Sequence, residues 1–148
     1  MQAGCAKSVA RLLQDPRVDP SANDSYAIQE AAFQGHGKIV KILLQDQRVD
    51  PSADDSYAFR WAARHGHAQI ARMLLQDQRV DPSAMRNYAL IWSAREGDGE
   101  IFAMLLQDPR VDLSVEIFER IFSIARFEKH WHIVELLEEH QARHVRLH

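Results

Sequence analysis

The stretch Leu43–Met73, LLQDQRVDPSADDSYAFRWAARHGHAQIARM, decides the fold because it recurs almost verbatim on both sides. The copy before it, Leu12–Ile42, is identical to it at 19 positions, and a third copy follows at Leu74–Met104. The period is 31 residues. A fixed period between about 20 and 50 residues is typical of a solenoid, in which each unit buries its apolar face by stacking on its neighbours.

Each unit is predicted to form two short helices joined by a tight turn. In the central copy, Ala62 and Ala63 follow Phe59 by three and four residues, the spacing of one helix face. Leu74 follows Ile70 by four residues and marks a second helix after the turn. Helices of about twelve residues are marginal in water on their own. We therefore expect stacking between units to hold them.

The residues at the ends of the predicted helices indicate how each unit is bounded. Ser56 precedes the first helix, and we expect it to cap that helix by accepting a backbone N–H bond. Ser25 and Asn87 occupy the same place in the neighbouring copies. Gly66 suits the left-handed residue that ends a helix. Pro51 cannot continue a helix, so the segment around it is predicted to be a polar loop.

This unit resembles the ankyrin repeat, whose family pattern runs TPLHxAAxxGHxxVVxLLL. Tyr57–Ala63 stands where TPLHxAA is expected, Gly66 and His67 form the GH pair, and Ile70–Leu75 matches the VVxLLL helix. The resemblance implies an all-α, helix-turn-helix solenoid of about four and a half stacked repeats. The unit lacks the Thr-Pro and His of TPLH and is shorter than the usual 33 residues. The resemblance therefore implies short β-hairpin fingers.

One solenoid is predicted over the whole chain. The segment Gly4–Val9 aligns with Gly35–Val40, one period later. We therefore expect the chain to begin at the second helix of a unit. We favour a piece of a longer array over a frayed end. Glu138 replaces an apolar residue in the last helix, as expected where a cap faces water. The predicted units are a half repeat at 1–15, repeats at about 16–46, 47–77 and 78–108, and a C-terminal capping repeat at 109–148.

Composition excludes several classes of partner. The 148 residues are 46% hydrophobic and 26% charged, which suits one globular domain. The net charge is −3 with both signs interspersed, so we expect no nucleic acid. No apolar run approaches the roughly 20 residues of a membrane span, and no signal peptide is visible. Cys5 is alone, which favours a reducing compartment, with the cytoplasm as the default.

No constellation of catalytic residues is apparent in the sequence. It contains no phosphate-binding glycine loop, nucleophile elbow or CxxC pair. Asp54 and Asp55 are explained as ordinary charges at a helix N-terminus, where the dipole favours them. We predict a protein that is not an enzyme and has no cofactor and no small-molecule substrate.

Histidine is the one chemically active residue type in excess, with eight copies. The resemblance implies that His36 and His67, in the GH pairs, bond to nearby backbone. His140, His144 and His148 are spaced by four and share a face of a continuous helix, a spacing that can bind zinc or nickel. A terminal helix lacks an anchored second shell, so we predict no metal site. Metal-dependent activity remains a third hypothesis, tested by removing the last ten residues.

The differences between the copies indicate where a partner binds. Positions that stay constant serve the stack, and those that change are free of it. The changing positions lie before and within the first helices, which in ankyrin-like proteins line the concave binding surface with the loop tips. They include tryptophan and arginine, which are enriched at interface hot spots. The predicted protein-binding residues are Gln29, Phe33, Gln34, Asp54, Asp55, Arg60, Trp61, Arg64, His65, Met85, Arg86, Ile91, Trp92, Arg95 and Glu96.

Two alternatives stand beside this interpretation. For Trp61 and Trp92 alone, packing between first helices as core is favoured over partner binding. The charged and polar positions, Arg60, Arg64, His65, Arg95 and Glu96, are expected to face solvent with or without a partner. The leading hypothesis is a monomeric, rigid module that binds a protein partner and loses little entropy on binding. The alternative is a structural spacer of a longer array.

Overall fold

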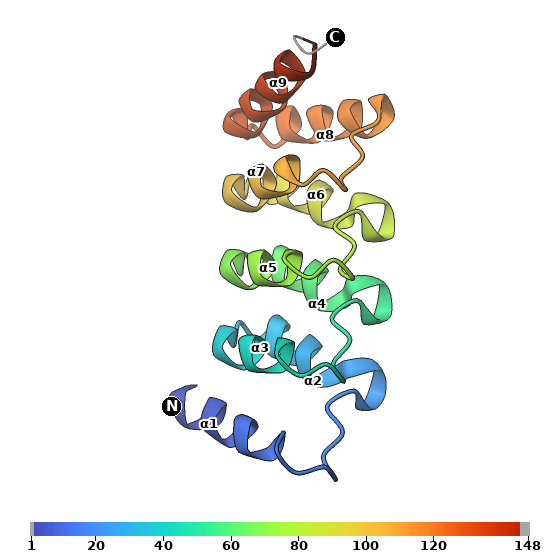
Figure 1. Cartoon of the computed structure of the whole chain (residues 1–148). Coiled ribbons are helices and arrows are strands. Elements are labelled where there is room, and N and C mark those ends of the chain that lie inside the picture. The colour runs from blue at the N-terminus through green and yellow to red at the C-terminus, as the bar shows by residue number, and fades with distance from the viewer. Residues whose placement is uncertain (1, 146–148) are drawn as a thin grey trace.

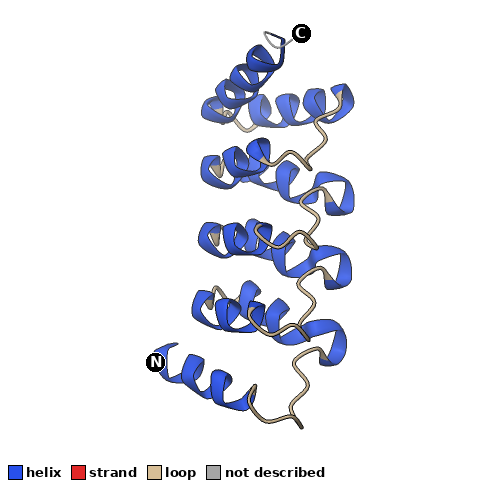
Figure 2. Cartoon of the chain, viewed as in Figure 1, coloured by secondary structure: helices blue, strands red, loops and turns tan. Residues whose placement is uncertain are grey.

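The computed structural model describes residues 2–145, in which every regular element is a helix (Figure 2). The all-α prediction is confirmed. The expected β-hairpin fingers are wrong, since residues 2–145 contain no strand. The helices are α1 (Gln2–Leu12), α2 (Ala22–Phe33), α3 (Gly37–Leu44), α4 (Ala53–Arg64), α5 (Ala68–Leu75), α6 (Ala84–Glu96), α7 (Gly99–Gln107), α8 (Val115–Phe127) and α9 (Trp131–Val145).

The helices stack in two layers along one axis (Figure 1). One layer, which we call the first-helix layer, contains α2, α4, α6 and α8, each in contact with the next. The second-helix layer contains α1, α3, α5, α7 and α9. No helix within the described range is both long and apolar enough to cross a membrane. Across residues 2–145, one single helix and four helix pairs correspond to the predicted four and a half repeats.

Small side chains hold the first-helix layer together. Ala31, Ala32, Ala62 and Ala63 are each at most 4% exposed, and their size allows α2 and α4 to approach closely. Leu74 on α5 is fully buried and belongs to the same core cluster as these alanines. Full burial of one leucine contributes about 1.5–3 kcal/mol. The core is therefore continuous from unit to unit, with no separate core in any one of them.

Arg110 fastens the last loop to the unit before it. Its guanidinium forms a bidentate salt bridge with Asp108, with Nη2 2.6 Å from Oδ2 and Nε 2.9 Å from Oδ1. The same side chain donates from Nη1 to the Val80 carbonyl at 2.8 Å and from Nη2 to the Leu75 carbonyl at 2.9 Å. Leu75 ends α5, and the last carbonyls of a helix have no partner within it. Arg110 therefore supplies a hydrogen-bond donor for the Leu75 carbonyl.

This arrangement, which we call the Arg–Asp clamp, recurs along the array. Arg48 donates to the Val18 and Leu13 carbonyls at 2.9 and 3.1 Å, and Arg79 reaches the preceding loop in the same way. Hydrogen bonding to Arg110 lowers the pKa of the Asp108 carboxyl below its ordinary value, although burial opposes this. The clamp therefore keeps a charged carboxylate beside each guanidinium. The four pairs are Asp15–Arg17, Asp46–Arg48, Asp77–Arg79 and Asp108–Arg110.

A left-handed turn forms the beginning of each of the three first helices α2, α4 and α6. In α4 the φ angles of Asp54, Asp55 and Ser56 are 53°, 52° and 56°. The residues 23–25 and 85–87 repeat this conformation. It costs a residue other than glycine about 1–2 kcal/mol, and asparagine and aspartate tolerate it best. The regular right-handed helix starts only after this turn.

The predicted N-caps are wrong, because Ser25 and Ser56 bond to the next unit instead of capping their helices. Ser25 and Ser56 are both 1% exposed. Their hydroxyls accept hydrogen bonds at 2.9 Å from the backbone N–H groups of Asp50 and Asp81, each 25 residues later. Asn87 is buried at the same place, and its Oδ1 has no partner. A serine before a helix is a capping signal in sequence, but here it joins neighbouring loops.

The GH histidines join each turn to the one before it. His67 Nε2 lies 3.2 Å from the Phe33 carbonyl oxygen, so the backbone bond implied for this residue is confirmed. Its ring covers Gly35, where an added Cβ would lie 2.8 Å from the imidazole. For His36 the implied bond stays a prediction, and its buried Nδ1 has no hydrogen-bond partner among the described residues. In the third unit Asp98 replaces the histidine and caps α7 instead.

The clamp predicts a difference between two arginines of the same loop motif. Replacing Arg110 by alanine removes charge-assisted bonds to two carbonyls, each worth about 1.5–3 kcal/mol, so we expect at least about 2 kcal/mol of lost unfolding free energy. Arg17 is the matched control, since within residues 2–145 it bonds only to Asp15. Arg17→Ala should change stability little. Urea unfolding followed by circular dichroism measures both, and equal losses would contradict the clamp.

The left-handed turn predicts a stabilising substitution. Arg86 is exposed and has a φ of 57°, a conformation that favours glycine. Arg86→Gly should raise the free energy of unfolding by about 0.5–1 kcal/mol, because the relief of strain exceeds the entropy that glycine loses. Lys41→Gly, at an exposed position of α3, should lower it by about 1 kcal/mol. Thermal melts of both variants test the opposite signs.

The contact between histidine and glycine predicts unequal costs at two turns. Gly66 and Gly97 have φ angles of 71° and 73°. A Cβ at Gly97 would lie 2.6 Å from His130, whereas at Gly66 its nearest neighbour is Asp98 at 3.6 Å. Gly66→Ala should cost about 1 kcal/mol for backbone strain, and Gly97→Ala about 1–3 kcal/mol more for overpacking. If denaturant midpoints fall equally, the histidine contact is not a tight one.

Candidate functional site

Aromatic and arginine side chains form a continuous ladder on the first-helix layer. The ladder crosses three units, from the end of α2 through α4 to α6. Most of its members come from positions that differ between the copies. The residues of the ladder are Phe33, Tyr57, Arg60, Trp61, Arg64, His65, Tyr88, Trp92 and Arg95.

Arg64 is the centre of the ladder. Its Cζ lies 4.5 Å from the ring centroid of Trp61 and 4.4 Å from that of Trp92. Both distances are well within the range of a cation–π interaction. Its Nη1 also donates a hydrogen bond of 3.0 Å to the Tyr88 hydroxyl. Arg64 is therefore half-buried and held between two units.

The aromatic rings extend the ladder in both directions. On the α2 side, Phe33 lies 5.6 Å from Trp61 and 4.7 Å from His65, measured between ring centroids. On the α6 side, Arg95 lies 5.6 Å from the Trp92 ring. Such pairs are worth about 0.5–1.5 kcal/mol beyond their buried area. The side chains are thus ordered by one another before any partner binds.

One position early in each of the helices α2, α4 and α6 makes contacts that stabilise the fold. Its occupants are Gln29, Arg60 and Ile91. Gln29 is 8% exposed and donates from Nε2 to the Asp24 carbonyl at 2.7 Å. Arg60 donates to the carbonyls of Asp54 and Asp55 at 3.0 and 2.8 Å. Each bond satisfies a carbonyl of the left-handed turn, and Ile91 packs against the core instead. Gln29 is therefore buried in the free chain, and Arg60 does not simply face solvent, while their predicted part in partner binding stays a prediction.

The tryptophans and Arg64 differ from the expectation in another way. Trp61 and Trp92 are half-buried and belong to the ladder, whereas the buried core does not include them. The favoured prediction of core packing is wrong for both. Arg64 was expected to face solvent, but the two indole rings cover its guanidinium. The predicted residues that are exposed are Gln34, Asp54, Asp55, His65, Met85, Arg86, Arg95 and Glu96.

Sequence comparison between the copies missed two tyrosines. Tyr57 lies 5.5 Å from Trp61, and Tyr88 lies 6.0 Å from Trp92, between ring centroids. Tyrosine is constant at this place in the three copies, so it was assigned to the stack. The spacing of four between each tyrosine and its tryptophan, which places both on one helix face, was the signal available.

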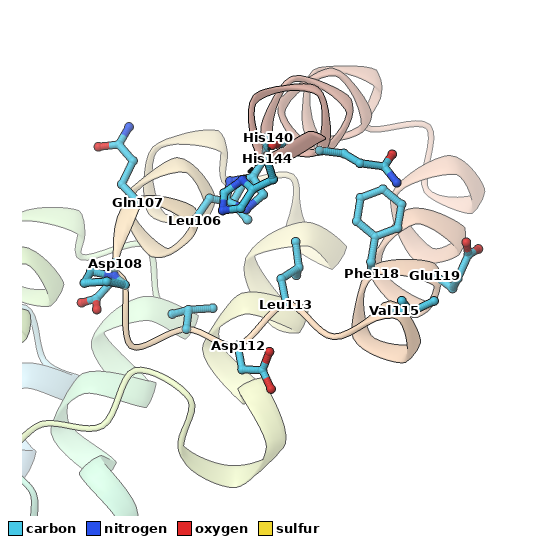
Figure 3. A pocket seen from close by; sticks show the side chains of 13 residues that line it. Leu106, Gln107, Asp108, Asp112, Leu113, Val115, Phe118, Glu119, His140 and His144 are labelled. Carbon is cyan, nitrogen blue, oxygen red and sulfur yellow. Dashed lines mark hydrogen bonds between the residues drawn. The ribbon is translucent and has the colours of Figure 1, made fainter. Parts of the chain in front are cut away.

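A hollow lies at the end of the array, between the last loop and α9 (Figure 3). Its volume is about 650 Å³, and Leu113, Phe118, His140 and His144 are among its lining residues. The two histidine rings are 4.2 Å apart. Burial, with the nearby charges of His144 and Arg143, lowers the pKa of His140.

This hollow has no set of metal ligands among the described residues. Across residues 2–145, no group of three or more His, Cys, Asp or Glu side chains is placed to hold a metal ion. His148, the third histidine of the predicted face, lies outside the described residues. We therefore assign no metal site to this hollow.

Stacked helix pairs with a ladder of side chains on one layer define a helical-repeat protein whose candidate site is a surface. A family model of ankyrin repeats in three copies matches residues 1–84 and 28–117. The chain belongs to the ankyrin-repeat family. Ankyrin repeats are generally protein-protein interaction modules, and the family is typically non-enzymatic. No curated protein matches the chain.

Proposed function

We propose that this chain is a non-enzymatic, monomeric module that binds a protein partner on the face of the first-helix layer. The observation that supports it is the ladder, which places two tryptophans and three arginines on one surface across three units. Tryptophan, tyrosine and arginine dominate the binding energy of protein interfaces. A structural spacer has no use for such a set.

The order of the ladder supports the proposal as well. Arg64 is held by two rings and a hydroxyl, and Trp61 by contacts with Phe33 and His65. Fixing one flexible side chain at an interface costs about 0.5–1.5 kcal/mol. A partner that binds side chains already fixed avoids most of this cost. In this proposal the solenoid acts as one rigid body and needs no cofactor, nucleic acid, membrane or small-molecule substrate.

The test compares two folded double variants in quantitative pull-downs from lysate of the source cell. Arg64→Glu with Trp92→Ala removes the centre of the ladder. Lys38→Glu with Gln69→Ala changes two exposed positions of the second-helix layer and serves as the control. Circular dichroism first establishes that both variants are folded. We expect a partner that the control retains and the ladder variant loses by at least about tenfold, since hot-spot truncations cost about 2 kcal/mol or more.

Two other results would contradict the proposal. A partner kept by the ladder variant and lost by the control would place the binding surface on the second-helix layer. If neither variant nor the parent retains a protein, the spacer hypothesis replaces the binding module.

A further inference from the structure

The arginines of the ladder lack the acidic partners that other arginines of the chain have. Within residues 2–145, neither Arg64 nor Arg95 forms an ion pair, and Arg60 bonds only to backbone carbonyls. The chain has 21 acidic and 18 basic residues, so carboxylates are not scarce. Glu96, the acid next to Arg95 in sequence, does not pair with it. The arginines that do form ion pairs are Arg17, Arg48, Arg72, Arg79, Arg110 and Arg143.

Arg64 has the geometry of a carboxylate-binding group. A guanidinium has five N–H donors, and in the described structure Arg64 uses one of them, for Tyr88. Trp61 and Trp92 lie against its planar group and fix its direction. The remaining donors form the planar fork that matches the two oxygens of a carboxylate. Because Arg64 is half-buried against the two rings, water screens its charge less than that of an exposed arginine, which strengthens an ion pair formed there.

The same position in each first helix forms a row across the array. Its occupants are Phe33, Arg64, Arg95 and, with a shift of one residue in the last unit, Phe127. Phe127 is 82% exposed, and Phe33 is half-buried. The row thus presents two cations between two apolar rings. This order is the same from either end of the solenoid, so it predicts the pattern of side chains in a ligand but not the direction of the ligand.

The spacing of the row sets the spacing of the ligand's side chains. Packed helices lie about 8–10 Å apart. A polyproline II segment has three residues per turn and rises about 3.1 Å per residue, so its residues three apart point in the same direction about 9 Å from one another. A peptide that crosses the first helices therefore places every third residue over successive members of the row. Two carboxylates three residues apart match the two arginines, and an apolar residue three positions further on matches each phenylalanine.

We propose that the first-helix face binds an acidic peptide segment in the polyproline II conformation, with two carboxylate side chains three residues apart and an apolar residue three positions from one of them. Arg64 receives one carboxylate in a forked pair, and Arg95 receives the other. The phenylalanine at the end of the row receives the apolar side chain. This inference rests on the proposed function and specifies the chemistry of the partner.

The test selects peptides from a random display library of dodecapeptides on the immobilised full chain. Selected sequences are then synthesised with a fluorescent label, and their dissociation constants are measured by fluorescence anisotropy. We expect enrichment of two acids separated by two residues. Changing both acids to their amides should weaken binding at least tenfold. Arg64→Lys should weaken it about tenfold, since lysine lacks the planar fork, and Arg72→Lys on the second-helix layer should not.

Arg95→Gln provides a second variant that cannot be explained by misfolding. Arg95 is exposed, and within residues 2–145 its side chain makes no hydrogen bond or ion pair. We expect Arg95→Gln to weaken the selected peptides severalfold, with an unchanged melting temperature. A melting temperature that falls together with affinity, or affinity that does not change, would overturn the assignment of Arg95.

The outcomes separate this inference from the proposed function. Selected peptides without paired acids, whose binding is still lost on Trp92→Ala, would overturn the carboxylate assignment and leave the first-helix face as the binding surface. Binding that tightens more than tenfold when phosphoserine replaces an acid would overturn it in favour of a phosphopeptide. If the selected peptides bind equally to the variant with Arg64→Glu and Trp92→Ala, both the inference and the proposed binding surface fail.

Discussion

The Arg–Asp clamp is the interaction on which the array depends. Helices of eight to thirteen residues, such as α3 and α6, gain too few internal bonds to persist alone. Alanine and leucine packing holds them side by side but leaves the carbonyls at helix ends and in loops without partners. Arg48, Arg79 and Arg110 reach back by 30 residues or more to supply donors to those carbonyls. Each loop is therefore bonded to the previous one, and the units keep one spacing.

That constraint explains which parts of the sequence are free to vary. The arginine and the second aspartate of the loop motif recur because they bond both within the loop and to a neighbouring unit. Arg48 bonds to Asp46 and to the Val18 carbonyl, and Asp50 accepts a bond from the Ser52 backbone N–H and donates its own N–H to Ser25. The exposed side of the first helices takes no part in these loop bonds. On this side Phe33, Arg64 and Arg95 occupy one position in three successive units. Repetition thus provides a regular support, and substitution at a few positions gives each unit a different chemistry.

The sequence was sufficient for the period, the helix pairs and the turn at Gly66, because these features depend on local spacing. It was not sufficient for the left-handed turns. Ser56 before a helix is indistinguishable from an N-cap until its partner, 25 residues away, is known. Gln29 was assigned to the surface for a similar reason, since its bond to a turn carbonyl exists only in that turn. Comparison between copies identified most of the ladder but not Tyr88, because a constant residue can serve both the stack and the surface.

Tyr88 shows how the support and the surface are joined. Its hydroxyl accepts a bond from Arg64 of the preceding unit, and its ring lies beside Trp92 of its own helix. The position of the central arginine is therefore fixed by two adjacent units, whose relative placement the clamps fix in turn. A shift between α4 and α6 would separate Arg64 from Trp92 and Tyr88 at once. The order of the binding face is thus a consequence of the stack, and stability and recognition in this chain rest on the same inter-unit contacts.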